Sequence, residues 1–295
     1  MAGTSAALRN RSGLRAWHAA VLYAAHQVLT GLLLIFIQAQ QIVGYDAEAL
    51  YRAARLGADA CVLLVLAMLV VAGEESVRQA FGSWKGARDL PRFSPIVVWY
   101  PLFAWSLFMA TAMITAAYDP AVALARYGFS AGNFVAPAPR FAWTDSVPAG
   151  ALLILSVCVT SPLVEEFVFR GVLFRQLAAR FGLSASILIT SALFGLVHGL
   201  DPFSFIRTFV LSVVLCLLYA RTGSVFATAI LHGAVNFSSG FMTPFVAALI
   251  PRHVLAALQT PLVVGIVLAL TVLIAAMTAL RSLRDLRFDG EVGKP

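Results

Sequence analysis

Charged residues are scarce in this sequence. Only 12% of its 295 residues are Asp, Glu, Lys or Arg, whereas 60% are hydrophobic. So little charge excludes an ordinary water-soluble domain and indicates an integral membrane protein in a lipid bilayer. The net charge of +7 does not indicate a nucleic-acid partner, because the basic residues lie in short connectors between apolar runs. We therefore expect no nucleic-acid binding.

Cysteine is also rare, and one common metalloprotease motif is missing. The three cysteines each lie within an apolar run and form no Cys-x-x-Cys pair, which argues against a disulfide framework or a thiolate metal site. We expect Cys61, Cys158 and Cys216 to be small buried hydrophobic residues. His-Glu-x-x-His is absent, so the zincin pattern is excluded.

The apolar runs predict an all-α fold, a polytopic membrane bundle of about eight transmembrane helices. Runs long enough to cross a bilayer core of about 30 Å lie at residues 17–40, 56–73, 95–117, 148–172, 184–200, 203–220, 224–240 and 258–280. The first run lacks a small-residue cleavage pattern, so we expect a retained anchor rather than a signal peptide.

The positions of these runs and of the polar motifs divide the chain into three parts. We expect an N-terminal transmembrane region of unknown role, a core that carries the motifs described below, and a final transmembrane helix with a cytoplasmic tail. Their boundaries are residues 1–147, 148–240 and 241–295.

The basic residues are distributed unevenly over the connectors. With the N-terminus inside, 15 Arg and Lys fall in inner segments and 6 in outer ones. Cytoplasmic loops carry an excess of Lys and Arg, so both termini are predicted to be cytoplasmic. The Ala-, Arg- and Gly-rich composition is typical of a high-GC bacterium, and we expect the bacterial plasma (inner) membrane.

Two glutamates and an arginine interrupt one apolar run, at Glu165, Glu166 and Arg170. Ionisable groups inside a membrane helix are costly and indicate a functional site by default. Glu166 and Arg170 are neighbours at i,i+4, so we expect a structural ion pair. Glu165 faces another direction and has no charge partner at helical spacing, which would leave it free to take a proton or bind a metal. Pro162, one turn earlier, predicts a kink.

A predicted hairpin turn brings a histidine to the depth of Glu165. The sequence Phe181-Gly182-Leu183-Ser184 ends one helix with a glycine and begins the next with a serine N-cap. Glu165 lies 17 residues before Gly182 and His198 lies 16 residues after it, so both sit roughly 25 Å above the turn.

A second hairpin turn, Arg221-Thr222-Gly223-Ser224, places His232 and Asn236 about 14 and 20 Å above the same face. Each polar residue has a structural explanation: His198 can cap its helix, and the other two can join helices through hydrogen bonds. Their common depth with an unpaired glutamate favours a site. No role is assigned to the remaining histidines, His18, His26 and His253.

These residues support two chemistries. A glutamate and a histidine that share a water can activate it for attack on a carbonyl, while a second histidine and an asparagine donate hydrogen bonds to the oxyanion. In the alternative, Glu165, His198 and His232 bind zinc and leave a fourth position open for water. We favour the metal-free chemistry, because Asn236 beside the second histidine suits an oxyanion donor better than a zinc ligand.

At these residues the chain resembles the CPBP family, the CAAX-protease and bacteriocin-processing intramembrane endopeptidases. The matching motifs, in the family's order, are Glu165-Glu166-x-x-x-Arg170, Phe194-x-x-x-His198 and His232-x-x-x-Asn236. The resemblance covers residues 148–240, about a third of the chain. It implies an intramembrane peptidase with a four-helix catalytic core, called a metalloprotease in older usage and a glutamic-type protease in newer usage.

The resemblance also implies roles for the motif residues. Glu165 and His198 would activate water, and His232 and Asn236 would hold the oxyanion. The supporting residues would be Glu166, Arg170 and Phe194.

The substrate stays open between a peptide and a membrane protein. Family members trim prenylated CAAX tails in eukaryotes or serve peptide processing, self-immunity or regulation in bacteria, where prenylated substrates are not expected. The alternative function is a non-enzymatic membrane binding or bacteriocin-immunity protein that keeps the polar cluster for structure or peptide capture. The sequence gives no oligomeric state, and it assigns no role to the first three helices.

Overall fold

The computed structural model describes residues 15–39, 47–72, 74–127, 129–130, 133–134, 147–243, 246 and 249–291. Within them the chain is a bundle of helices with one small antiparallel hairpin, β1 (Phe129–Ser130) paired with β2 (Asn133–Phe134). The predicted all-α class is therefore confirmed. The longest helices are α2 (Ala16–Ala39), α3 (Ala47–Val71), α6 (Ile96–Tyr118), α11 (Leu183–His198), α12 (Pro202–Thr222), α13 (Val225–Phe237) and α16 (Pro261–Glu291).

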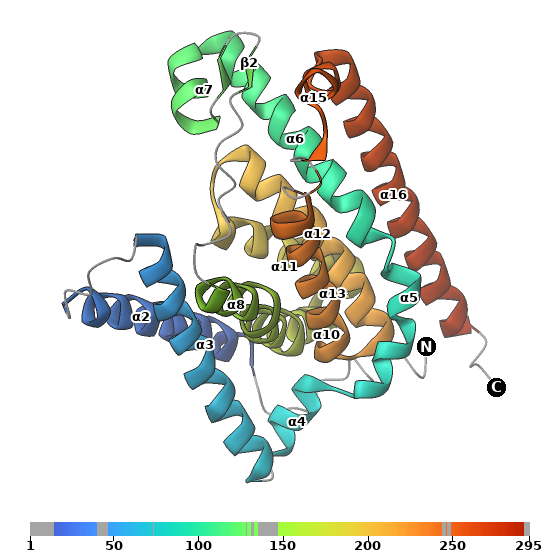
Figure 1. The fold of residues 1–295 in the computed structure, drawn as a ribbon. Helices are drawn as coiled ribbons and strands as arrows, with labels where there is room; N and C mark the ends of the chain where they lie inside the picture. Colours follow the sequence, from blue (N-terminus) through green and yellow to red (C-terminus); the bar gives the residue numbers. More distant parts are fainter. Residues whose placement is uncertain are drawn as a thin grey trace.

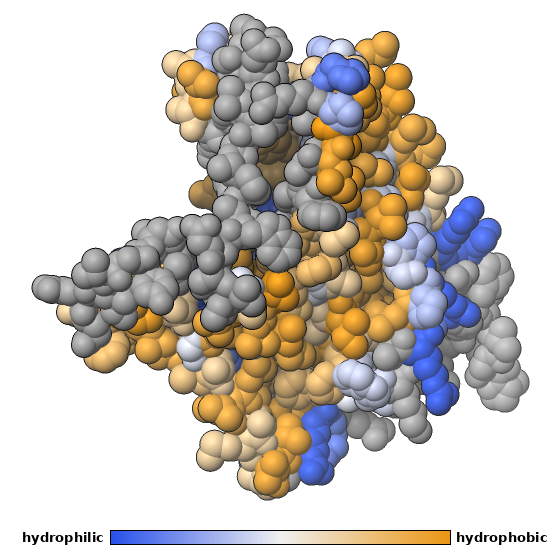
Figure 2. Space-filling model, viewed as in Figure 1, coloured by the Kyte–Doolittle hydropathy of each residue, from blue (hydrophilic) through white to orange (hydrophobic). Residues whose placement is uncertain are grey.

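The bundle has the dimensions of a polytopic membrane protein. Seven of the described helical spans are long and apolar enough to cross a membrane: Trp17–Ala39, Leu50–Val71, Leu90–Tyr118, Gly150–Phe181, Pro202–Thr222, Val225–Met242 and Pro261–Arg281. The run predicted at 184–200 forms α11, whose 16 residues extend about 24 Å and fall short of a bilayer core of about 30 Å. In Figure 2, hydrophobic side chains cover most of the coloured part of the visible face, and hydrophilic ones lie at its right, beside the C-terminal part of α16, and in smaller groups at its top and bottom.

A continuous helical segment through the middle of the bundle carries the glutamates. It consists of α8 (Val147–Leu155), the π-helical η2 (Ser156–Thr160), α9 (Ser161–Glu166), the π-helical η3 (Phe167–Phe174) and α10 (Arg175–Phe181). Proline lacks the N–H that would bond to residue i−4, and η2 comes directly before the turn that holds Pro162. The kink at Pro162 stays a prediction, and the structure shows a π segment just before this proline, a feature that is frequent at functional sites.

Both predicted hairpin turns are present, with one difference in capping. Gly182 has φ 78° and forms the C-cap of α10 and the N-cap of α11. The predicted serine N-cap at Ser184 is wrong, because α11 already begins at Leu183. At the second turn Gly223 is left-handed with φ 60°, and the Ser224 hydroxyl accepts a hydrogen bond from the Ala227 N–H at 3.2 Å.

The connector between the second and third long helices is folded onto the core. It contains α4 (Glu75–Phe81), the 3-10 helix η1 (Trp84–Asp89) and α5 (Leu90–Phe93). A Cβ on Gly82 would lie 1.7 Å from the Gly223 carbonyl oxygen, so the connector touches the second hairpin turn directly. Arg175 donates a hydrogen bond to the Gln79 carbonyl and fixes α4 against the central segment.

Two helix pairs flank the core. The α2–α3 pair and the α6–α16 pair lie on opposite sides of the helices between α8 and α13 (Figure 1). α2 packs against η3, and α3 packs against η2 and α9. The remaining short elements are α7 (Pro120–Tyr127), the π-helical η4 (Ser238–Met242) and α15 (Arg252–Leu258). The first two helices therefore contact the segment that carries the glutamates.

Candidate active site

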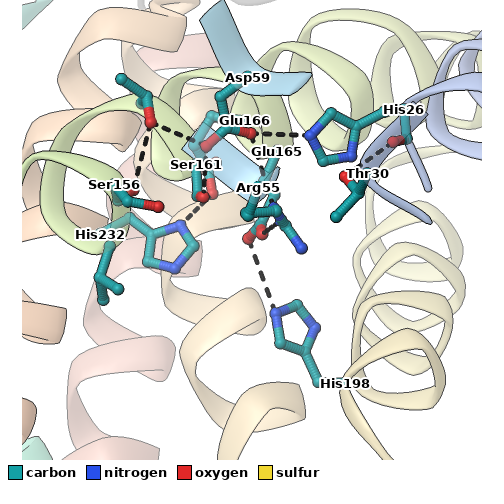
Figure 3. Close-up of polar contacts among 12 residues, drawn as sticks. His26, Thr30, Arg55, Asp59, Ser156, Ser161, Glu165, Glu166, His198 and His232 are labelled. Atoms are coloured by element: carbon teal, nitrogen blue, oxygen red, sulfur yellow. Dashed lines mark hydrogen bonds and ion pairs between the residues drawn. The ribbon is translucent and has the colours of Figure 1, made fainter. Parts of the chain in front are cut away.

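Glu165 and His198 face each other across the first hairpin, as their predicted equal depth requires (Figure 3). Glu165 Oε2 lies 3.6 Å from His198 Nε2. His198 Nδ1 donates to the Phe194 carbonyl at 2.7 Å, because a carbonyl can only accept. That bond fixes the ring and turns Nε2 toward the carboxylate. A gap of 3.6 Å is too long for a good hydrogen bond but allows one water molecule to contact both groups.

The predicted ion pair between Glu166 and Arg170 is confirmed. Arg170 Nη1 lies 2.8 Å from Glu166 Oε1, and both side chains are fully buried. The same carboxylate oxygen accepts a hydrogen bond from His232 Nδ1 at 2.9 Å. His232 is therefore held by Glu166, whereas His198 faces Glu165 (Figure 3).

Phe194 lies at the centre of this polar cluster and is fully buried. Its ring centroid is 4.3 Å from that of His198 and 5.8 Å from that of His232. The Arg170 guanidinium lies over the same ring at 4.7 Å and donates to the Ser212 hydroxyl at 2.8 Å. An aromatic face attracts a cation, so this ring helps to hold the buried guanidinium and separates the two histidines.

Asn236 reaches the central segment from α13. Its Nδ2 donates to the Val157 carbonyl at 2.9 Å, and since an amide nitrogen carries two hydrogens, one donor is left over. The approach depends on Gly233, one turn earlier, where a Cβ would lie 2.0 Å from the Cys158 carbonyl oxygen. The backbones of α13 and η2 are therefore in direct contact beside this part of the site.

One expectation about Glu165 is wrong: its carboxylate has a charge partner. Arg55 Nη2 of α3 lies 2.7 Å from Glu165 Oε1. The sequence reasoning looked for partners only along the same helix and began the second helix at residue 56, which placed Arg55 in an outer connector. α3 begins at Ala47, so Arg55 lies inside the bundle with its side chain 13% exposed.

The sequence reasoning also missed a buried network behind Arg55. Asp59 Oδ1 lies 2.8 Å from His26 Nε2 and 3.6 Å from Arg55 Nε. Asp59 Oδ2 accepts hydrogen bonds from the hydroxyls of Thr160 and Ser161 at 2.8 and 2.7 Å. Oppositely charged residues at i,i+4 within an apolar run, here Arg55 and Asp59, were a signal that could have revealed it.

A cavity of about 430 Å³ opens onto the glutamate–histidine pair. It is lined by Tyr23, Gln27, Tyr51, Arg55, Glu165, Val197 and His198. Four of these residues come from α2 and α3, two helices without a motif that predicts a role. The cavity therefore brings two tyrosine rings beside a carboxylate and an imidazole, and convergent polar groups of this kind mark a candidate binding site.

The side chains as placed do not fit a zinc ion. Among the described residues, no three His, Cys, Asp or Glu side chains form a metal-binding group. The Arg55 guanidinium occupies one oxygen of Glu165. The set Glu165, His198 and His232 would have to rearrange to ligate a metal.

Residues 147–238 match the family model described as type II CAAX prenyl endopeptidase, Rce1-like. The match covers the central helical segment, α11, α12 and α13, which include all three motifs. Among curated proteins and among solved structures, none matches the chain. The fold, the motifs and this match together show that residues 147–238 of this polytopic membrane protein form an Rce1-like domain of the CPBP family.

Proposed function

We propose that this protein is an intramembrane endopeptidase that hydrolyses a peptide bond of a membrane-associated substrate with water activated by Glu165 and His198. The observation that carries the proposal is the 3.6 Å approach of Glu165 Oε2 to His198 Nε2 beside a 430 Å³ cavity. The match of this domain to an endopeptidase family supports it.

The reaction begins with a water molecule between the two side chains. Glu165 takes a proton from the water as its oxygen bonds to the scissile carbonyl carbon, which becomes tetrahedral. The carbon–nitrogen bond then breaks, and the proton passes from Glu165 to the leaving amine. His198 orients the water through Nε2. The products are a carboxylic acid and an amine, and no covalent intermediate with the protein forms.

His232 and Asn236 are the proposed donors to the oxyanion. Asn236 has a second amide hydrogen beyond the one given to Val157. His232 gives Nδ1–H to Glu166, so donation from its other nitrogen requires a proton on Nε2 as well. The buried Glu166 carboxylate is the group that would face that positive ring. Preorganised donors of this kind stabilise the transition state of acyl transfer.

We propose that the reaction uses no metal ion. The position of Arg55 supports this proposal, since a guanidinium 2.7 Å from Glu165 Oε1 already supplies a positive charge where a metal would bind. A carboxylate that accepts from a guanidinium can still use its other oxygen as a base.

A non-enzymatic binding or immunity protein is the second candidate. One observation favours it: Glu165, Glu166, His232 and Asn236 each have a partner within the protein, as structural polar groups do. This candidate predicts that Glu165→Gln alters binding or immunity without changing the peptide termini of other membrane proteins.

The two candidates are separated by a comparison of membrane-protein termini. Cells expressing the wild type, the Glu165→Gln variant or neither are compared by mass spectrometry of peptide N- and C-termini. We expect new termini only with the wild type, at equal protein amounts. Identical termini in all three samples would remove the peptidase proposal and leave the binding or immunity candidate.

A further inference from the structure

The two oxygens of the Glu165 carboxylate have different partners, Arg55 for one and His198 for the other. Nη2 of Arg55 is 2.7 Å from Oε1, and Nε2 of His198 is 3.6 Å from Oε2. A charge-assisted hydrogen bond of this length fixes the rotation of the carboxylate about its terminal bond. With Oε1 occupied, Oε2 is the oxygen presented to His198 and to a water that contacts both groups from the side.

Asp59 forms a second ion pair with Arg55. The Asp59 carboxylate lies 3.6 Å from Arg55 Nε and is itself fully buried. It is held by His26 at 2.8 Å and by the hydroxyl of Ser161 at 2.7 Å. The part-buried guanidinium therefore lies in ion pairs with two carboxylates, which together restrain its position.

These contacts form a matched pair of links between two helices. Arg55 and Asp59 are four residues apart on α3, and their partners Glu165 and Ser161 are four residues apart on α9. The residue order is reversed, as in an antiparallel packing of the two helices. Side chains at i and i+4 lie on one face of a helix, so one face of α3 holds one face of the catalytic helix at two points.

We propose that Arg55 is a positioning residue for hydrolysis: it holds Glu165 so that Oε2 faces His198, and it is itself aligned by Asp59. This inference rests on the proposed peptidase function and adds to the motif residues a side chain from outside the matched domain. Arg55 also lines the cavity, but its guanidinium already faces two carboxylates, so it serves Glu165 rather than capturing an anionic substrate.

The test measures both catalysis and stability in protein reconstituted in lipid nanodiscs. The variants are Arg55→Gln, Arg55→Lys, Glu165→Gln and the double variant Arg55→Gln/Glu165→Gln, with Arg92→Gln as the control. Arg92 lies on α5, and its side chain is 59% exposed. The substrate is a quenched fluorescent peptide that spans a cleavage site found in the comparison of termini, and thermal unfolding is followed without peptide.

We expect Arg55→Gln to lower kcat by about ten- to a hundredfold with KM within about twofold, since a misplaced catalytic group costs rate more than binding. Arg55→Lys should recover much of the loss because it restores a cation, and Arg92→Gln should match the wild type. In thermal unfolding, the double variant should lose less Tm than the sum of the two single variants, because the two residues are partners.

The outcomes separate the two proposals. Wild-type kcat in a folded Arg55→Gln variant, or equal losses for Gln and Lys, would overturn the positioning role while leaving the peptidase intact. Additive losses of Tm would overturn the ion pair. A wild type that cleaves no faster than Glu165→Gln would instead overturn the proposed peptidase, with the Tm comparison still deciding whether Arg55 and Glu165 are coupled.

Discussion

Glu165 and Glu166 are adjacent in the chain, but their carboxylates have different surroundings. Glu166 is fully buried between Arg170 and His232, on the inner side of the segment. Glu165 faces a cavity, with one oxygen toward Arg55 and the other toward His198. Only the second carboxylate faces the cavity, and this difference in direction supports the proposed roles of Glu165 as base and Glu166 as support.

The Glu166–Arg170 pair predicts a specific pattern of stabilities. Removal of either partner leaves a buried charge uncompensated, so Glu166→Gln and Arg170→Met should each lower the free energy of unfolding by about 3–5 kcal/mol. The double variant should unfold at a higher temperature than either single variant. Thermal unfolding in detergent or nanodiscs measures all three, and equal melting temperatures would contradict the pairing.

The proposed roles predict different losses of rate for different residues. Glu165→Gln and His198→Ala should bind a fluorescent peptide but leave it uncleaved, because both remove activation of water. Asn236→Ala should keep a trace of turnover, since one oxyanion donor is worth about 10²–10³ in rate. Single-turnover rates measure these losses. Complete loss of turnover in a stable Asn236→Ala variant, or normal turnover in His198→Ala, would contradict the assignment of roles.

At the scale of elements, the site depends on close contact between the central segment and its neighbours. α13 meets η2 at Gly233, beside the hydrogen bond from Asn236 to Val157. The π-helical segments on both sides of α9 change the direction of side chains relative to a regular helix. Glu165 thereby shares a short stretch of helix with Ser161, which carries the link to α3.

Gly233→Ala adds only one methyl group, but we expect it to lower both Tm and the cleavage rate. The added Cβ would lie 2.0 Å from the Cys158 carbonyl oxygen, a backbone atom that a rotamer change cannot move. Forced packing costs about 1–3 kcal/mol and should displace both His232 and Asn236, so Tm and cleavage rate should fall together. Gly265→Ala on α16 is the matched control, because its Cβ would meet no atom within 4 Å. An unchanged Gly233→Ala protein would contradict the close helix contact.

Spacing along helices and across turns was enough to predict part of this site. The Glu166–Arg170 pair follows from i,i+4 geometry, and the approach of His198 to Glu165 follows from counting residues on both sides of Gly182. The contact from Arg55 could not be predicted in this way, because no turn links α3 directly to α9. Its register depends on how two separate helices pack, and the helix boundary was misplaced by nine residues, 56 against 47.

At the scale of the whole molecule, α2 and α3 form one wall of the cavity, and α6 and α16 pack on the other side of the core (Figure 1). The proposed chemistry therefore lies in the matched domain, and α2 and α3, outside that domain, line part of the cavity beside it. Two arginines used to predict topology are internal charges. Arg170 pairs with Glu166, and Arg55 pairs with Glu165, so neither reports the orientation of a loop.

The topology prediction is the same without Arg170 and Arg55, because the other inner arginines and lysines still outnumber the outer ones. With eight crossings, α11 included, reporter fusions at Gly290 and near Pro137 should lie on opposite sides of the membrane, with Gly290 cytoplasmic. Paired phosphatase and fluorescent-protein fusions measure this. Both reporters on the same side would show that the number of crossings between these positions is even, and α11 would be the first helix to remove from the count.

The most direct test of the central claim is peptide cleavage by purified, chelator-treated protein in nanodiscs. The wild type and Glu165→Gln are compared on the same quenched peptide, and bound metal is measured by mass spectrometry. Water activation by Glu165 without a metal predicts wild-type cleavage that persists after exhaustive chelation, metal well below one ion per chain, and no cleavage by Glu165→Gln. Loss of wild-type activity to the chelator with recovery on adding zinc would contradict the metal-free mechanism, and normal cleavage by Glu165→Gln would contradict the role of Glu165 itself.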